Sequence, residues 1–174
     1  MLIEKIFLNI LCRKQALPYE AVLSEAMEPL ILEATETISR VFGRSARIRQ
    51  VDAGSCNACE WELTALTNPV YDIGRFGIDF VASPRHADIL LVTGPVAVAM
   101  VEALKKTYTA MPGPKIVIAC GDCSKDGGVY RGSYAVTDGV HNVLPVDGYI
   151  TGCPPSPSNL IRGIVDIIAS RVKL

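Results

Sequence analysis

The sequence contains few aromatic residues and no marked excess of either charge. Aromatic residues make up 6% of the 174 residues, and histidine occurs only twice. The 17 Lys and Arg residues nearly balance the 18 Asp and Glu residues, so the formal net charge is −1. Because chains that bind nucleic acid usually carry a basic surplus, this balance argues against nucleic acid as a partner. Disorder is also excluded, since 49% of the residues are hydrophobic and only 20% are charged.

Long hydrophobic runs are missing as well. A membrane-spanning helix needs about 20 consecutive apolar residues. One long charge-free run that is rich in apolar residues, between Asp88 and Glu102, is interrupted by Gly94-Pro95. Glu4 and Lys5 fall where a signal peptide would be apolar, so we expect no secretory leader and a cytoplasmic chain. Structural disulfides are rare in that compartment, so six cysteines indicate metal or redox chemistry.

Residues 1–45 differ in character from the rest and are predicted to form an N-terminal helical arm. Apolar residues at helical spacing predict a short amphipathic helix over 3–11 and a longer one over 20–42, which Gly43 would end. Two roles for this arm stay open. It covers the core of its own domain, or it docks on a partner subunit, including one embedded in a membrane.

Residues 46–174 are predicted to form one α/β domain. Strands are expected at 48–53, 77–83, 89–93, 116–120 and 149–151, with helices at 61–66, 96–108 and 159–172. The runs Ile89–Val92 and Ile116–Ala119 are apolar without alternation, which is typical of strands buried on both faces. Strands that alternate with helices predict a doubly wound, flavodoxin-like, mostly parallel sheet.

Four cysteines follow the ends of predicted strands. Cys56 and Cys59 follow the first strand, Cys123 follows a buried strand, and Cys153 follows the last one. Ligands of doubly wound sheets bind at the carboxyl ends of the strands, so these loops can converge. Four converging thiolates suit a tetrahedral soft metal ion or an iron–sulfur cluster.

The remaining cysteines, Cys12 and Cys120, permit two rival interpretations of the motifs. Cys56/Cys59 and Cys120/Cys123 form two Cys-x-x-Cys pairs, a pattern typical of zinc sites. Cys120, however, ends an apolar strand and is predicted to be a core thiol, while Cys12 packs in the arm. A thioredoxin-like redox site is disfavoured because it needs neither the Cys123 loop nor the Cys153 loop.

Three motifs together resemble a known family. They are Gly-Ser-Cys-Asn-Ala-Cys-Glu-Trp-Glu at 54–62, Gly-Asp-Cys-Ser-Lys-Asp-Gly-Gly at 121–128 and Gly-Cys-Pro-Pro at 152–155. The chain resembles the small subunit of membrane-bound, energy-converting nickel–iron hydrogenases (group 4 type). These are related to the 20-kilodalton cluster-bearing subunit of NADH:quinone oxidoreductase. The resemblance covers about residues 46–172 and includes the segments 75–79, 84–88 and 93–95.

This resemblance implies an electron-relay subunit of an oxidoreductase complex. It implies one 4Fe–4S cluster on Cys56, Cys59, Cys123 and Cys153, with electrons passing between a ferredoxin-like subunit and the nickel–iron site of a hydrogenase large subunit. Integral-membrane subunits would hold the chain peripherally at the cytoplasmic side of the cell membrane. The two residues between Cys56 and Cys59 favour the hydrogenase branch, because the quinone-reductase relatives have adjacent cysteines there. Three alternatives stay open: an equivalent subunit of a quinone-reducing complex, one of a complex that reduces a sulfur compound, or a structural zinc scaffold.

Charged and aromatic neighbours of the motifs have two interpretations each. Glu62 matches an acidic residue of the relatives, and it either serves a proton route or tunes the cluster, or it is a first-turn glutamate favoured by the helix dipole. Glu60 is assigned mainly to the second role. Trp61 is an interface anchor or a core residue. Arg75, Arg85 and His86 are expected to face solvent or a partner subunit rather than bind metal.

Overall fold

The computed structural model describes residues 19–172, with side-chain environments for residues 29–171. Its centre is a five-stranded, all-parallel sheet in the order β2-β1-β3-β4-β5. The strands are β1 (Ala46–Asp52), β2 (Ile78–Phe80), β3 (Ile89–Thr93), β4 (Ile116–Cys120) and β5 (Gly148–Ile150). This is the strand order of flavodoxin-like folds, so the predicted fold class is confirmed.

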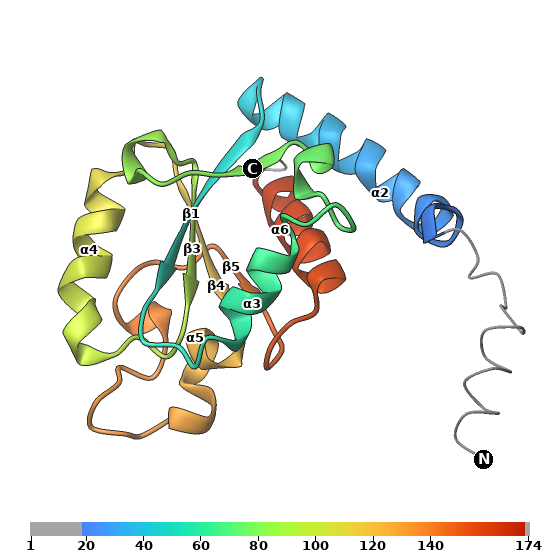
Figure 1. The fold of residues 1–174 in the computed structure, drawn as a ribbon. Coiled ribbons are helices and arrows are strands. Elements are labelled where there is room, and N and C mark those ends of the chain that lie inside the picture. Colours follow the sequence, from blue (N-terminus) through green and yellow to red (C-terminus); the bar gives the residue numbers. More distant parts are fainter. Residues whose placement is uncertain (1–18, 173–174) are drawn as a thin grey trace, which may run out of the picture.

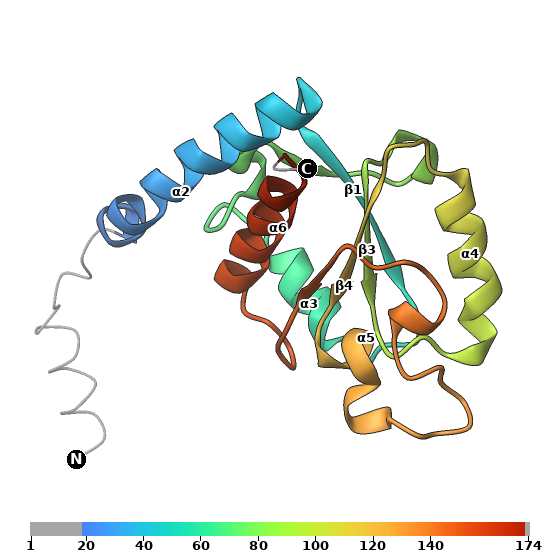
Figure 2. The ribbon, with the colours of Figure 1, turned by 180° about the vertical axis from the view of Figure 1, so that it is seen from behind.

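Helices cover both faces of the sheet (Figure 1). They are α2 (Tyr19–Phe42), α3 (Ala58–Ala65), α4 (Val101–Ala110), α5 (Asp122–Asp126) and α6 (Pro157–Val172). Figure 2 shows α2, α3 and α6 on one face and α4 alone on the other, with α5 at the carboxyl end of the strands. Within residues 19–172, no helix is long and apolar enough to cross a membrane.

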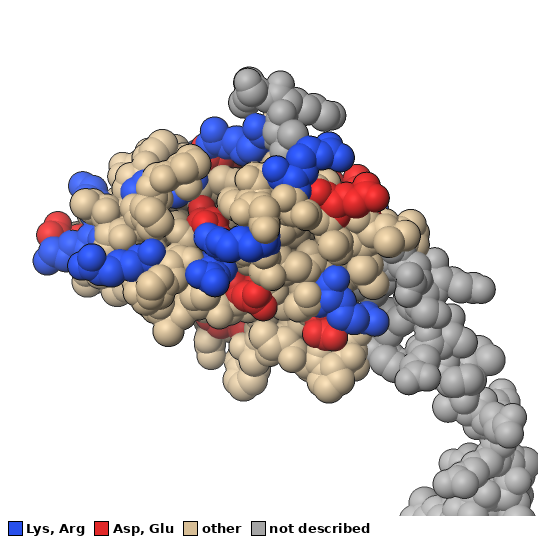
Figure 3. Space-filling view, turned by 90° about the horizontal axis from the view of Figure 1, so that it is seen from above, with Lys and Arg blue, Asp and Glu red and all other residues tan. Residues whose placement is uncertain are grey.

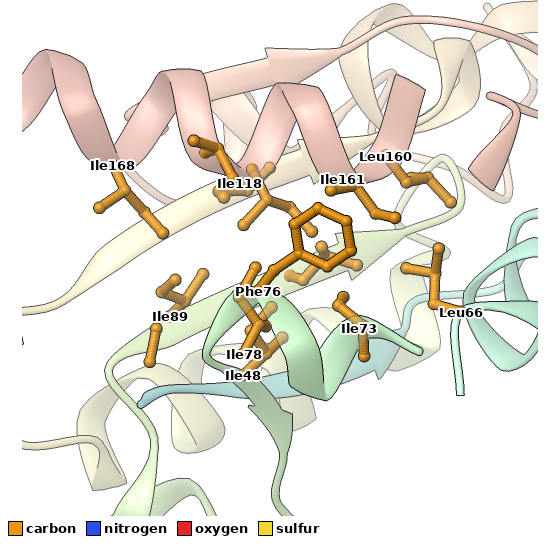
Figure 4. Close-up of a cluster of buried hydrophobic side chains, with 14 of the residues drawn as sticks. Ile48, Leu66, Ile73, Phe76, Ile78, Ile89, Ile118, Leu160, Ile161 and Ile168 are labelled. Atoms are coloured by element: carbon orange, nitrogen blue, oxygen red, sulfur yellow. The ribbon is translucent and has the colours of Figure 1, made fainter. Parts of the chain in front are cut away.

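Two apolar clusters, one on each face of the sheet, form the core. In the larger one, the ring of Phe76 lies between the sheet and the α6 side chains Leu160 and Ile161 (Figure 4). All five residues of β3 and all five of β4 are buried, as their unbroken apolar runs predict. The rigid centre of the sheet therefore supports the loops at its two ends.

The helix predicted over 20–42 is confirmed as α2. Gly43 ends it at φ +64°, and its N–H donates to Ser39 O at 2.9 Å. Ala34 and Ile38 of α2 are buried in the larger cluster, where α2 packs against α6. This part of the arm therefore covers the core of its own domain. The helix predicted over 3–11 and Cys12 lie outside the described residues, and the domain division at residue 45 remains a prediction.

Most predicted elements occur with shifted ends. The strand expected over 77–83 is only Ile78–Phe80, because the chain turns at Pro84–His86. The helix expected over 96–108 begins with a 3-10 turn at Val98–Met100 and continues as α4. The short helix α5 was not predicted, because five residues carry no helical periodicity.

Candidate metal centre

The three cysteine loops meet at the carboxyl end of the sheet. Cys56 lies in the loop after β1 and Cys59 in the first turn of α3, while Cys123 lies in α5 and Cys153 in the loop after β5. Cys56 and Cys153 are exposed, whereas Cys59 and Cys123 are half-buried. The Cys153, Cys56 and Cys59 thiols all lie close enough to Cys123 to raise its pKa electrostatically. The fold therefore brings together the four thiols that the sequence singles out.

Backbone hydrogen bonds join the Cys123 and Cys153 loops. Gly121 N–H donates to Ile150 O at 2.8 Å, and Asp122 N–H donates to Gly152 O at 3.0 Å. The Asp122 carboxylate then accepts the Gly152 N–H at 2.8 Å. Because each loop supplies a donor and an acceptor to the other, the two loops hold one relative position. Asp122, which the sequence only places beside Cys123, is the residue that connects them.

The Cys56–Cys59 loop is fixed by two carboxylates. Asp52 Oδ1 accepts the N–H groups of Gly54 at 2.9 Å and Ser55 at 2.8 Å. Ser55 Oγ donates to Glu60 Oε2 at 2.7 Å, and the buried hydroxyl of Thr93 at the end of β3 donates to Glu60 Oε1. Glu60 therefore ties the start of α3 to the sheet. The helix-dipole interpretation misses this role, because Thr93 is 33 residues away in the chain.

Two glycines allow the backbone to approach the cysteine sulfurs. Gly121 has φ +89°, and a Cβ there would lie 2.7 Å from Cys59 Sγ. Gly128 has φ +51°, and a Cβ there would lie 3.0 Å from Cys123 Sγ. Both positions require a conformation that L side chains rarely adopt, and both lack space for a methyl group. Glycine at these two positions therefore lets the backbone pass directly beside the Cys59 and Cys123 sulfurs.

Cys120 is fully buried at the end of β4, which confirms it as a core thiol. Its thiol also hydrogen-bonds to Cys59, and this interaction lowers the pKa of Cys59. The same bond, together with burial, raises the pKa of Cys120 far above its usual range, so Cys120 stays protonated and acts as the donor. The sequence does not predict this contact. The signal is the position of Cys120 directly before Gly121, which lies against Cys59.

The Cys123 sulfur lies in a mixed environment. Burial raises the pKa of Cys123 most, and the nearby Cys153 thiol raises it further. The Val129 N–H donates to the sulfur and lowers the pKa of Cys123. A backbone N–H that points at a thiolate sulfur is the kind of donor that tunes an iron–sulfur centre.

The donor set fits an iron–sulfur cluster by its chemistry. Among residues 19–172, no three Cys, His, Asp or Glu side chains gather around a single point where one metal ion could bind. Thiolates of a four-iron cluster each bind a different iron atom, so they need to surround a shared space rather than a point. Cys123 has the other three thiols within electrostatic range, from loops at one end of the sheet, which suits such a cluster.

The other singled-out residues divide between the two ends of the sheet. Glu62 is half-buried in α3 and, with Glu60 and Asp122, lies close enough to Cys59 to oppose its ionisation. Trp61 is 69% exposed, so the interpretation of it as a core residue is wrong. The arginines at 75 and 85 and the histidine at 86 are exposed in turns at the amino end, so they can face solvent or a partner subunit.

Comparison with known proteins agrees with this geometry. Residues 56–167 match the family model described as NADH ubiquinone oxidoreductase, 20 Kd subunit. The chain is 42% identical over 137 residues to the probable membrane-bound hydrogenase subunit mbhJ of Pyrococcus furiosus, covering 79% of this chain and 82% of the relative. It is 47% identical to formate hydrogenlyase subunit 7 of Escherichia coli, covering 69% of this chain and 47% of that protein.

A solved structure with the same fold is that of a membrane-bound sulfane sulfur reductase, an archaeal respiratory membrane complex. One of its chains matches with a TM-score of 0.64 and 32% identity over 79% of this chain and 77% of its own length. Members of the family typically bind a 4Fe–4S cluster. The chain therefore belongs to the NADH ubiquinone oxidoreductase 20 Kd subunit family, the small iron–sulfur subunits that serve electron transfer in multisubunit hydrogenase and respiratory complexes.

Proposed function

We propose that this chain carries one 4Fe–4S cluster on Cys56, Cys59, Cys123 and Cys153 and relays electrons inside a membrane-bound hydrogenase complex. The observation that carries the proposal is the convergence of these four cysteines at the carboxyl end of the sheet. Such a cluster, when bound, accepts and releases one electron at a time. The chain's own residues supply the ligands, the second layer of hydrogen bonds and the surface for partners.

The protein around the thiols favours fast electron exchange. The Cys120 thiol and the Val129 N–H both donate toward ligand sulfurs, and such donors stabilise the extra negative charge of a reduced centre. The loop hydrogen bonds hold the ligands in place, so little rearrangement accompanies the change in charge. Cys56 and Cys153 are exposed, which leaves the ligand set open toward a neighbouring subunit.

Apolar side chains are exposed around the same end of the sheet. They follow the carboxyl ends of the strands and are Trp61, Val98, Val129, Tyr130 and Tyr134, of which Tyr134 is 98% exposed. Exposed aromatic and aliphatic residues beside a functional site are typical of protein interfaces. We assign this surface to the large subunit that carries a nickel–iron site, with a ferredoxin-like subunit as electron donor and integral-membrane subunits as anchors at the cytoplasmic side of the cell membrane. The complex would reduce protons or oxidise hydrogen.

The sulfur-reducing alternative has an observation of its own. The matched chain of the sulfane sulfur reductase complex shares the fold at 32% identity, while mbhJ of a membrane-bound hydrogenase is 42% identical. The two assignments differ in the partner subunit, because only a nickel-containing partner activates hydrogen. Metal analysis of the purified complex separates them: nickel bound to the large subunit supports the hydrogenase assignment, and its absence with sulfur-reducing activity supports the alternative.

Cys153→Ala tests the cluster directly. This variant removes a ligand, so the paramagnetic signal of one reduced cluster should disappear from the purified complex, and hydrogen-dependent activity should fall to background. Cys120→Ala is the matched control. It removes a thiol that touches Cys59 but that we do not assign as a ligand, so the signal should persist. Full signal and activity in Cys153→Ala would contradict the ligand assignment. If the wild-type protein were colourless and contained zinc, the scaffold alternative would be supported, since iron–sulfur clusters absorb visible light and bleach on reduction.

Glu62 is proposed to serve the proton route or to tune the cluster. In Glu62→Gln, slower turnover with an unchanged cluster signal would support the proton route. A shifted cluster potential would support tuning, since Glu62 lies within electrostatic range of Cys59. The first-turn interpretation of Glu62 is wrong, because the acidic residue in the first turn of α3 is Glu60. A variant that changes neither property would therefore leave Glu62 without a role at the site.

A further inference from the structure

The carboxyl half of β1 has a neighbouring strand on one side only. β1 contains seven residues, but β2 contains three and pairs only with Ala46–Ile48. On its other side, β1 pairs with β3 over Ile48–Asp52. The sheet thus has an open stretch of edge at residues 49–52, which we call the β1 edge.

Backbone groups on the β1 edge are unpaired. Residues of a parallel strand alternate in the neighbour that they bond. Ala46 N–H donates to Gly77 O and Ile48 O accepts from Val81 N–H, so even-numbered residues of β1 face the β2 side. Gln50 and Asp52 therefore face the place where β2 has already ended. Within the described part of the chain, no backbone hydrogen bond reaches them from that side.

A hollow lies directly beside this edge. Its volume is about 320 Å³, and it lies between β1, α3 and the segment after β2. The lining residues are Ile48, Arg49, Gln50, Leu63, Thr64, Thr67, Phe80, Val81 and Ala82. Ile48 and Leu63 are buried apolar residues, whereas Thr64 and Thr67 are exposed. The hollow can therefore take an apolar side chain that enters from a segment along the edge.

Arg49 adds an unmet donor at the same place. Its Nη1 donates to Ala82 O at 2.7 Å, but its Nε is buried and has no hydrogen-bond partner among the described residues. A buried donor of a charged group is costly to leave unpaired. Among the described residues, the hydrogen bonds of the Asp52 carboxylate come from the Gly54 and Ser55 N–H groups, and none joins it to Arg49.

We propose that the β1 edge binds an extended segment of another subunit of the complex, which pairs with β1 beyond the end of β2 and brings a carboxylate to the Arg49 guanidinium. The free backbone N–H and C=O groups of Gln50 and Asp52 are two residues apart, the spacing at which an extended peptide forms hydrogen bonds when it adds to the edge of a sheet. A second copy of this chain is the competing occupant, and it would protect this edge already in the chain alone. That the partner is a subunit of the complex rests on the proposed function, whereas the binding of a peptide strand does not.

This segment would lie next to the candidate metal centre. The β1 edge leads directly into the loop that carries Cys56 and Cys59. A strand added here would restrict that loop from the side and would shield the hollow under α3 from water. The interface would therefore include the side of the sheet as well as its carboxyl end.

Amide hydrogen exchange at single-residue resolution tests the proposal on the full chain, alone and in the purified complex. The Gln50 and Asp52 amides should exchange rapidly in the chain alone and about tenfold or more slowly in the complex. The Arg49 and Val51 amides face β3 and should change little. Equal exchange of Gln50 and Asp52 in both samples overturns the proposal. Slow exchange in the chain alone also overturns it, since the chain's own N-terminal residues or a second copy would then be the occupant.

A pair of variants separates backbone pairing from a small-molecule site. Gln50→Pro removes an N–H that makes no backbone hydrogen bond within residues 19–172, and proline is tolerated at a free strand edge. The affinity of the full-length variant for complex from which this subunit has been removed should fall by about tenfold, which corresponds to the loss of one hydrogen bond. Gln50→Ala keeps the N–H, so this variant should lose less than about twofold in the same affinity. Equal losses would instead indicate a ligand that binds the Gln50 side chain. The cluster signal should persist in both variants, so the strand proposal can be refuted without refuting the cluster assignment.

Discussion

The two ends of the sheet use charged residues in opposite ways. At the amino end, carboxylates form ion pairs and bond strand amides. Asp88 accepts two hydrogen bonds from Arg44 at 2.8 Å and the Arg47 N–H at 3.0 Å, while Asp147 pairs with Arg171 and accepts the Val117 N–H at 2.7 Å. Figure 3 shows Lys and Arg interspersed with Asp and Glu on this face.

At the carboxyl end, carboxylates shape loops instead. Asp52, Glu60 and Asp122 bond loop N–H groups and hydroxyl groups, and they hold the cysteines in position at tight glycine turns. Large apolar side chains are exposed there. The difference indicates that substitutions at the amino end change stability and leave the site intact, whereas substitutions at the carboxyl end change the site.

Of the substitutions that test this comparison, Gly121→Ala should have the largest effect, which is loss of the cluster. It adds a Cβ 2.7 Å from Cys59 Sγ at a backbone with φ +89°. The left-handed conformation alone costs about 1–2 kcal/mol, and the Cβ also displaces Cys59. We expect most of the cluster to be lost, measured as iron content and as the paramagnetic signal of the purified chain.

Gly132→Ala is the matched control for this change. Gly132 has a similar φ of +77°, but nothing lies within 4 Å of its Cβ position. It should therefore lose a similar amount of backbone stability while keeping its cluster. If both variants lost the cluster to the same extent, the close approach at Cys59 would not matter.

Asp88→Ala should have a smaller effect, confined to stability. It removes the pair with Arg44 and leaves the half-buried Arg47 N–H without its acceptor. Loss of such an acceptor costs about 1–3 kcal/mol. Urea denaturation followed by circular dichroism measures this loss in the free energy of unfolding. The cluster signal should be that of the wild type, and a weakened signal would argue that the two ends of the sheet are not independent.

Lys106→Ala should have the smallest effect. Lys106 and Glu102 of α4 form a pair at 3.3 Å, but their side chains are 76% and 74% exposed. Exposed pairs at this spacing contribute about 0.3–0.5 kcal/mol and are screened by salt. The same urea titration at low and high salt checks this expectation. If Lys106→Ala lost as much stability as Asp88→Ala, the expectation that a more buried ion pair contributes more would be wrong.

The elements predicted well are those with strong local patterns. β3 and β4 occur at the predicted residues because each is a continuous apolar run bounded by charged or glycine residues. The positions of the cysteines after predicted parallel strands were enough to predict that the four lie at one end of the sheet, since the carboxyl ends of such strands share one edge. The roles of Glu60 and Cys120 were missed, because their partners, Thr93 and Cys59, are distant in the chain.

The sequence by itself determined the fold class, the family and the end of the sheet that holds the cysteines, since periodicity and motif spacing are local properties. Only the tertiary structure decided how the loops are held, that Trp61 is exposed, and that β2 ends before β1 does. These features depend on contacts between segments far apart in the chain, which no local pattern of residues specifies.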